Sequence, residues 1–254
     1  MLTARALPAH SSAEPILQSM KAFPAAMAAF SLTIAAGCLT LGVWQLRRLD
    51  ERRNFNEILA RRLSIAPSTR AALPTDTANA RYRRVTLSGT YDYDNEFVLT
   101  SRTRMGSPGV NIITPVRLPA TDTAVLVNRG WVYAPDGMTV DLAKWRERDS
   151  VSGVGYVATY PPPRQGSVAA RSRPKAYRWL DRSTLSEVAS YPLAPYYVVL
   201  AADTTPVPRD VPQSNPPRLP APLLDEGPHR GYAFQWFSFA AISIVGTYLF
   251  LRRK

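Results

Sequence analysis

The chain has 254 residues, of which 46% are hydrophobic, and a formal charge of +12 at pH 7. Between two apolar segments near its ends, 26 basic and 18 acidic residues leave the central stretch at +8. The sequence has no helix-turn-helix, zinc-finger or RNA-binding signature, which argues against nucleic-acid binding. The positive charge therefore favours contact with anionic lipid or an acidic partner.

The two apolar segments lie at residues 22–46 and 231–251. They are 25 and 21 residues long and contain no Asp, Glu, Lys, Arg or His. Each exceeds the roughly 20 residues that a helix needs to cross about 30 Å of hydrocarbon. We therefore predict an N-terminal tail over residues 1–21 and two transmembrane helices, at 22–46 and 229–251.

The first apolar segment is predicted to be a span and not a cleaved signal. It is longer than the roughly 7 to 15 residues of a signal core. It also stays apolar beyond Cys38, where a lipoprotein would turn polar. Because a single cysteine forms no internal disulfide, Cys38 is interpreted as a small membrane residue. The basic tail at residues 252–254 favours both chain ends inside and the central domain outside.

Beyond the first span, the pattern changes from helix to strand. Helical spacing continues to Leu59, a stop follows at residues 64–67, and small and polar residues complete a linker, so that 47–80 form a helical extension and linker. Short β-branched and aromatic runs then predict strands at 85–91, 96–101, 110–118, 124–133, 151–160 and 195–202, with a helix at 183–190 capped by Ser183 or Asp181.

The close spacing of these strands favours an antiparallel sheet in one domain, residues 81–204. Residues 205–228 are rich in proline and predict an extended, stiff tether. The predicted fold class is an α+β membrane protein, in which two transmembrane helices at the chain ends flank an antiparallel β-rich extramembrane domain.

Catalytic motifs are absent from the sequence. It has no Gly-rich phosphate loop, His-based zinc motif or nucleophile elbow, and Asp92 and Asp94 fit turn chemistry. Apart from His10, the only histidine is His229, at the entry of the second apolar segment. We predict a protein that is not an enzyme, with a membrane-anchored enzyme of unrecognised chemistry as an alternative.

Several short motifs resemble, in order, those of the surfeit locus protein one family of cytochrome oxidase assembly factors. The resemblance covers roughly four-fifths of the chain, from Leu41 to the C-terminus. Its motifs are Gly42-Val43-Trp44-Gln45-Leu46 with Arg48, Tyr82-Arg83-Arg84-Val85, residues 109–115 ending in Thr114-Pro115, Val127-Asn128-Arg129-Gly130-Trp131-Val132, and His229 with Tyr232-Ala233 and Trp236-Phe237. The family often has Asn-Asn where this chain has Gly227-Pro228.

The resemblance implies a biogenesis factor for haem-copper oxidases that handles haem a or inserts it into the catalytic subunit. It implies His229 as the haem iron ligand. The implied partners are the oxidase catalytic subunit, the haem a synthesis machinery and membrane lipid. The implied location is a bacterial plasma membrane, or the mitochondrial inner membrane in a eukaryote. A haem-independent membrane chaperone of the oxidase is the other alternative.

The surroundings of His229 on a regular helix leave two interpretations open. One face carries His229, Ala233, Trp236 and Ala240, with Tyr232 and Ser243 at its edge. Small residues there would leave room for a flat macrocycle against Trp236. They would equally admit the first span, where Ala25, Ala29, Thr33 and Gly37 recur every four residues, while the aromatic residues would anchor at the interface.

Three further residues complete the predicted cofactor-binding set. Arg129, placed after a strand, would contact a haem propionate or make a salt bridge in a turn, the latter being favoured. Trp44 lies at the outer edge of the first span, where tryptophan is a common anchor. Gln45 is an unusual residue at that depth, and we predict that it contacts the second span near His229.

Overall fold

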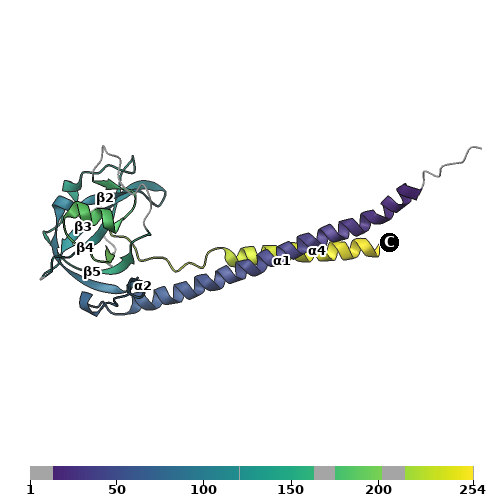
Figure 1. Ribbon diagram of the computed structural model, residues 1–254, viewed down its shortest axis with the longest axis horizontal. Helices are drawn as coiled ribbons and strands as arrows, with labels where there is room; N and C mark the ends of the chain where they lie inside the picture. The colour runs from purple at the N-terminus through teal and green to yellow at the C-terminus, as the bar shows by residue number, and fades with distance from the viewer. Residues whose placement is uncertain (1–13, 120, 163–174, 202–214, 254) are drawn as a thin grey trace, which may run out of the picture. The chain divides into compact units, whose positions relative to one another are not determined.

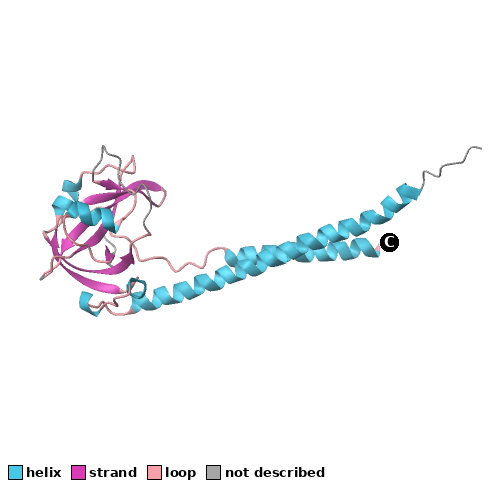
Figure 2. Ribbon diagram, in the orientation of Figure 1, coloured by secondary structure: helices cyan, strands magenta, loops and turns pink. Residues whose placement is uncertain are grey.

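A pair of long helices and a β-sheet form the two parts of the protein in the computed structural model (Figure 1, Figure 2). The structure describes residues 14–119, 121–162, 175–201 and 215–253. One compact unit comprises Met1–Glu57 with Asp225–Lys254, and the other comprises Ile58–Leu224. The elements are α1 (Glu14–Ser64), η1 (Arg70–Ala72), α2 (Thr77–Ala80), β1 (Arg84–Tyr91), η2 (Tyr93–Asn95), β2 (Phe97–Arg104), β3 (Ser107–Arg117), β4 (Ala124–Tyr133), η3 (Leu142–Trp145), β5 (Ser150–Thr159), β6 (Ala176–Tyr177), α3 (Arg182–Ala189), β7 (Tyr196–Leu200) and α4 (His229–Arg252).

The first unit is an antiparallel pair formed by α1 and α4, which lie side by side in Figure 2. Both helices are long and apolar enough to cross a membrane. Near one end of the pair, the Thr247 hydroxyl donates to Oγ of Ser31 at 2.7 Å. Near the other end, Gln45 contacts His229 at 2.8 Å. Because the earlier residue of α1 contacts the later residue of α4, the two helices run antiparallel.

Small side chains form the seam between the two helices. Between residues 35 and 49, buried positions on α1 alternate in steps of three and four residues, the spacing of coiled-coil packing. The ring of Phe237 packs where a Cβ on Gly42 would lie, so this glycine permits the close approach. The buried seam residues are Ala35, Cys38, Gly42, Gln45 and Leu49 on α1, and Ala233 and Ala240 on α4.

The small-residue stripe predicted to admit the other span is not the one that packs. Ala25, Ala29, Thr33 and Gly37 are all exposed, and Gly37 has open space beside it. A spacing of four residues advances about 40° beyond a full helical turn at each step, so such a stripe winds around the helix. Alternating steps of three and four follow the partner helix more closely, which is why the seam uses another face.

The second unit contains a seven-stranded sheet in the order β1-β5-β7-β4-β3-β2-β6. A further pairing of β1 with β3 closes the first five of these strands into a ring. The prediction of an α+β chain is confirmed, but a purely antiparallel sheet was wrong. β2 pairs with β6, and β4 with β7, in parallel. Both pairs join strands far apart in the chain, whose long connections permit parallel pairing.

The strand predictions agree with the sheet to within a few residues at each end. All six predicted strands are present, as β1 to β5 and β7, while the two-residue β6 was not predicted. The predicted short helix is α3, and of its two cap candidates Asp181 is the cap, since its carboxylate accepts from the Ser183 N–H at 3.2 Å. α1 ends at Ser64, where the stop was predicted.

The described part of the Pro-rich segment contacts the second unit. Residues 205–214 of this segment lie outside the described residues. The part that follows is docked on the second unit, because the Trp131 N–H of β4 donates to the Pro217 carbonyl at 2.9 Å. Gly130 lies directly against that carbonyl with φ of +148°, a conformation that favours glycine. Residues 215–219 of the predicted extended tether are therefore docked on the second unit.

Candidate functional site

His229 is the first residue of α4 and faces α1. Pro228 is the N-cap of the helix, and its carbonyl accepts from the Tyr232 N–H at 3.1 Å. The imidazole Nδ1 lies 2.8 Å from Oε1 of Gln45, whose side chain is buried in the seam. The predicted contact between Gln45 and the second apolar helix near His229 is confirmed.

The turn that leads into His229 is held by two arginines of α1. The Nε of Arg52 donates to the Asp225 carbonyl at 2.8 Å. Arg53 donates from Nε and Nη2 to the two carboxylate oxygens of Glu226, at 3.0 and 3.1 Å. The Gly227 N–H donates to the Asp225 carboxylate at 2.9 Å. Although exposed ion pairs add little stability, a bidentate pair restricts orientation and so directs the chain toward α4.

Gly227 has a backbone conformation that suits the turn leading into His229. Its φ is +70°, in the left-handed region that glycine adopts freely and asparagine tolerates best among other residues. Glycine therefore suits this turn, and asparagine is the other residue that would fit it with little strain. A Cβ on Gly227 would lie 3.5 Å from Nε2 of His229, so the absent side chain leaves that edge of the imidazole uncovered.

The aromatic residues of the predicted set lie around this end of the helix pair. Trp44 and Tyr232 are 49% and 47% exposed. Trp236 is half-buried and meets Phe239 edge to face, with ring centroids 6.0 Å apart. Roles of these three residues in cofactor binding stay predictions.

The face of α4 expected to accept a macrocycle is covered by α1. Ala233 and Ala240 are 2% and 1% exposed because the first helix packs over them. The alternative, that small residues on this face admit the first span, is confirmed. Small side chains serve close helix contact equally well, which is why the sequence left both interpretations open.

His229 could supply one imidazole nitrogen to a haem iron. The imidazole has one nitrogen engaged by an amide oxygen and the other free of hydrogen bonds within the described residues. Ligating histidines commonly donate their second N–H to such an oxygen. In the part of the chain that the structure describes, no group of three or more His, Cys, Asp or Glu side chains could hold a bare metal ion.

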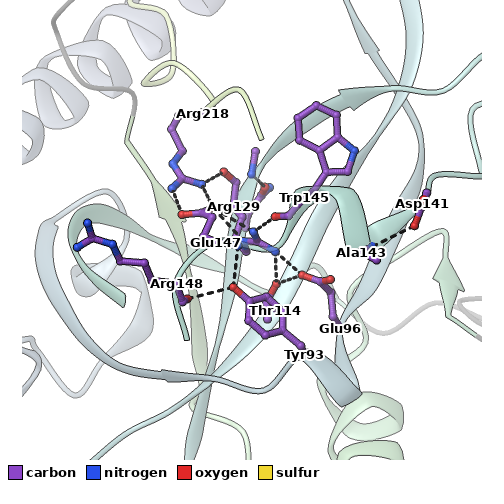
Figure 3. A network of polar contacts seen from close by, with 12 residues as sticks. Tyr93, Glu96, Thr114, Arg129, Asp141, Ala143, Trp145, Glu147, Arg148 and Arg218 are labelled. Atoms are coloured by element: carbon purple, nitrogen blue, oxygen red, sulfur yellow. Dashed lines mark hydrogen bonds and ion pairs between the residues drawn. The ribbon is translucent and has the colours of Figure 1, made fainter. Parts of the chain in front are cut away.

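Arg129 lies at the centre of a buried polar network in the second unit (Figure 3). Its Nη1 donates to Glu96 at 2.5 Å, its Nε donates to Glu147 at 3.1 Å, and Nη2 donates to the Trp145 carbonyl. The Arg129 side chain is 0% exposed. Arg218 completes the network by donating to both carboxylate oxygens of Glu147 at 2.8 and 2.7 Å.

A β-bulge turns Arg129 into the interior. Ile112 pairs with Gly130 and Ile113 with Asn128, so Arg129 has no partner on β3. An extra residue of this kind bends the strand and redirects its side chain. The favoured salt bridge is confirmed, but its predicted location in a turn was wrong. A haem propionate would have to displace Glu96 or Glu147 to reach this guanidinium, and that role stays a prediction.

The two carboxylates beside Arg129 differ in their protonation behaviour. Burial raises the pKa of Glu147, but the hydrogen bond and charge of Arg218 and the charge of Arg129 lower it by more, so its pKa lies below the ordinary value. Burial raises the pKa of Glu96 above its ordinary value despite hydrogen bonds from Thr114 and Arg129. Glu147 therefore stays ionised to a lower pH than Glu96.

Sequence reasoning did not single out Glu96, Glu147 or Arg218. An arginine inside an apolar strand does signal a buried acidic partner, because an unpaired buried charge is costly. The chain offers 19 acidic residues, however, and only the packing of β2, β3 and β4 selects among them.

Comparison with known proteins places these features in a family. The model of the SURF1 family matches residues 32–241. A SURF1-like protein of Monosiga brevicollis is 27% identical over 88% of this chain and 86% of its own length. A SURF1-like protein of Rickettsia felis is 25% identical over 85% and 92%. The cytochrome oxidase assembly protein Shy1 of Saccharomyces cerevisiae is 27% identical over 55% of this chain and 37% of its own. The family match extends from α1 to α4, and the chain belongs to the SURF1 family.

Proposed function

We propose that this chain is a membrane-anchored assembly factor for cytochrome oxidase that handles haem a on its way to the catalytic subunit. Family membership and the assembly role in the name of Shy1 support the oxidase part. The observation that carries the haem part is the 2.8 Å contact of His229 with Gln45, which leaves the other imidazole nitrogen free. Neutral imidazole is the form that binds metals.

The outer surfaces of α1 and α4 support membrane anchoring. The side chains of Phe30, Phe234 and Ile242 are 65%, 75% and 67% exposed. In water, each Å² of exposed apolar surface would cost about 25 cal/mol. The hydrocarbon core of a membrane would remove this cost. We propose both chain ends on the cytoplasmic side, or the matrix side in a mitochondrion, with the central domain on the opposite side.

In this proposal haem a is cargo, received from the haem a synthesis machinery and passed to the oxidase, and the chain itself performs no catalysis. His229 would hold the iron. The exposed rings of Tyr232 and Trp44 would offer apolar surface beside it. Anionic or acidic groups on lipid or on the oxidase would meet the basic surface of the central domain.

The decisive experiment is co-expression with haem a synthesis enzymes, followed by absorption spectra of the purified full-length protein. Wild type is expected to carry haem a, and His229→Ala to lose most of it. His10→Ala, which removes the only other histidine, is the matched control and is expected to keep full occupancy.

Equal haem in wild type and His229→Ala would overturn the ligand assignment. A wild-type protein that co-purifies with the oxidase subunit but never carries haem would identify a haem-independent chaperone instead. For topology, a reporter at the C-terminus that is active only outside the membrane would overturn the proposed orientation.

A further inference from the structure

The contact between Gln45 and His229 constrains where the imidazole proton lies. The amide oxygen Oε1 of Gln45 only accepts hydrogen bonds, and it lies 2.8 Å from Nδ1 of His229. With the amide in this orientation, the imidazole proton lies on Nδ1. A neutral imidazole carries one such proton, so Nε2 keeps its lone pair.

The opposite edge of the ring is the one left free. Within the described residues, Nε2 of His229 makes no hydrogen bond, and a Cβ on Gly227 would lie 3.5 Å from it. The turn itself is held to α1 by Arg52 and Arg53. The ring is therefore oriented from one side by α1 and left open on the other.

We infer that Gln45 is a positioning residue, which holds His229 in the tautomer protonated on Nδ1 and thereby presents Nε2 as the atom that binds iron. This inference rests on the proposed haem function. It assigns Gln45 a task through His229, without contact with the haem itself. Second-layer partners of metal ligands commonly fix the tautomer and orientation of the ligating ring in this way.

A purely structural role for Gln45 makes a different prediction. Polar side chains join helices in apolar surroundings by hydrogen bonds, whichever way the amide points. With the amide reversed, its NH₂ would donate to Nδ1 and the proton would lie on Nε2, which could not then bind iron. The position of the imidazole proton therefore distinguishes a positioning role of Gln45 from a role limited to holding the two helices together.

The first test measures that proton without haem. Full-length protein labelled with ¹⁵N-histidine is studied by NMR in detergent at a pH where the imidazole is neutral, in a His10→Ala background that leaves His229 alone. Wild type is expected to be protonated on Nδ1, Gln45→Glu to keep that state because it keeps an acceptor, and Gln45→Met to lose the preference. A proton on Nε2 in the wild type, or an unchanged tautomer in Gln45→Met, overturns the inference.

The second test uses haem a loading of the same variants. Gln45→Met is expected to weaken haem binding about ten- to a hundred-fold, and Gln45→Glu to retain binding with a lower reduction potential, since a carboxylate accepts more strongly. Thr247→Val is the matched control, because it removes another polar contact of the helix pair, the 2.7 Å bond to Ser31. It is expected to leave the spectrum and potential unchanged.

The two tests separate the inference from the function on which it rests. If the tautomer follows Gln45 but wild type never binds haem a, the proposed function fails and the iron-presenting role fails with it. If wild type binds haem a through His229 and Gln45→Met binds it equally well, the positioning role alone is overturned. An effect of Thr247→Val as large as that of Gln45→Met would show a general loss of helix pairing and would also overturn it.

Discussion

Arg129 and Glu96 form an ion pair of 2.5 Å in which the two side chains are 0% and 2% exposed. Arg129 lies on β4 and Glu96 directly before β2, and Thr114 of the intervening β3 donates to the same carboxylate. Three strands are thus joined by one buried charged contact. Because a buried charge without a partner is costly, any strand register that separated this pair would be destabilised.

Arg129→Met is expected to destabilise the central domain by about 3–5 kcal/mol, because it leaves the buried carboxylate of Glu96 without its ion-pair partner. The free energy of unfolding is measured with urea on the full-length protein in detergent. Arg148→Met removes an exposed arginine and is expected to change it by less than about 0.5 kcal/mol. Comparable losses in both variants would contradict a central role for the network.

Stability is expected to fall as the pH drops below the ordinary glutamate value of 4.5. The folded pKa of Glu147 is lowered, so its contribution is present above the unfolded value and is lost as the pH falls through the folded value. Thermal unfolding between pH 7 and pH 3 measures this, and Glu147→Gln is expected to be less stable at pH 7 but less sensitive to acid.

Glu96 acts in the opposite direction, since its folded pKa is raised. It adds stability as the pH falls from the folded value toward 4.5. Glu96→Gln is therefore expected to lose that gain and to show a steeper net fall from pH 7 to pH 3 than wild type. Identical pH profiles for Glu96→Gln and Glu147→Gln would contradict these assignments.

Gly130→Ala is expected to release the docked part of the Pro-rich segment. The added Cβ meets the Pro217 carbonyl, and φ of +148° strains any other residue, at a cost of about 1–3 kcal/mol. Limited proteolysis should then cut near Arg218. Gly153→Ala on β5 is the control, since open space surrounds that glycine, and it is expected to resist cleavage like wild type. Equal resistance in both variants would disprove the docking.

Gly227 is expected to accept asparagine but not valine. At φ of +70°, asparagine is tolerated, whereas a β-branched side chain is strained and places bulk beside Nε2 of His229. With haem a co-expression, Gly227→Asn should keep most of the wild-type pigment and Gly227→Val should lose it. Gly231→Val, at a neighbouring helical glycine with open space, tests whether bulk alone is harmful and should retain pigment.

The helices and strands were predictable because their signals are local. Long uncharged runs identified the apolar parts of α1 and α4, and β-branched runs identified six strands. The contact of Gln45 with His229 was also predictable, since Gln45 is an unusual polar residue near the end of the first apolar segment and His229 lies at the start of the second. Their distance along the chain did not matter, because two antiparallel helices bring such ends together.

The partners of Arg129 were not predictable in the same way. Its burial depends on a one-residue bulge in β4 opposite β3, and nothing in the local sequence distinguishes that bulge from regular pairing. The parallel pairs β2–β6 and β4–β7 likewise depend on long-range connections. Docking of residues 215–219 depends on the absence of a Cβ at Gly130, where the Pro217 carbonyl packs, and composition alone does not reveal this contact.

By itself, therefore, the sequence determined the two apolar helices, the strand-rich domain between them, the family resemblance and the prominence of His229, because hydropathy, periodicity and short motifs are properties of neighbouring residues. Only the tertiary structure decided three further points. α1 covers the face of α4 that the sequence left available to a macrocycle, Arg129 is buried against Glu96, and Gln45 contacts Nδ1 of His229. Each of these depends on which distant side chains share one small volume, and packing and desolvation select that set.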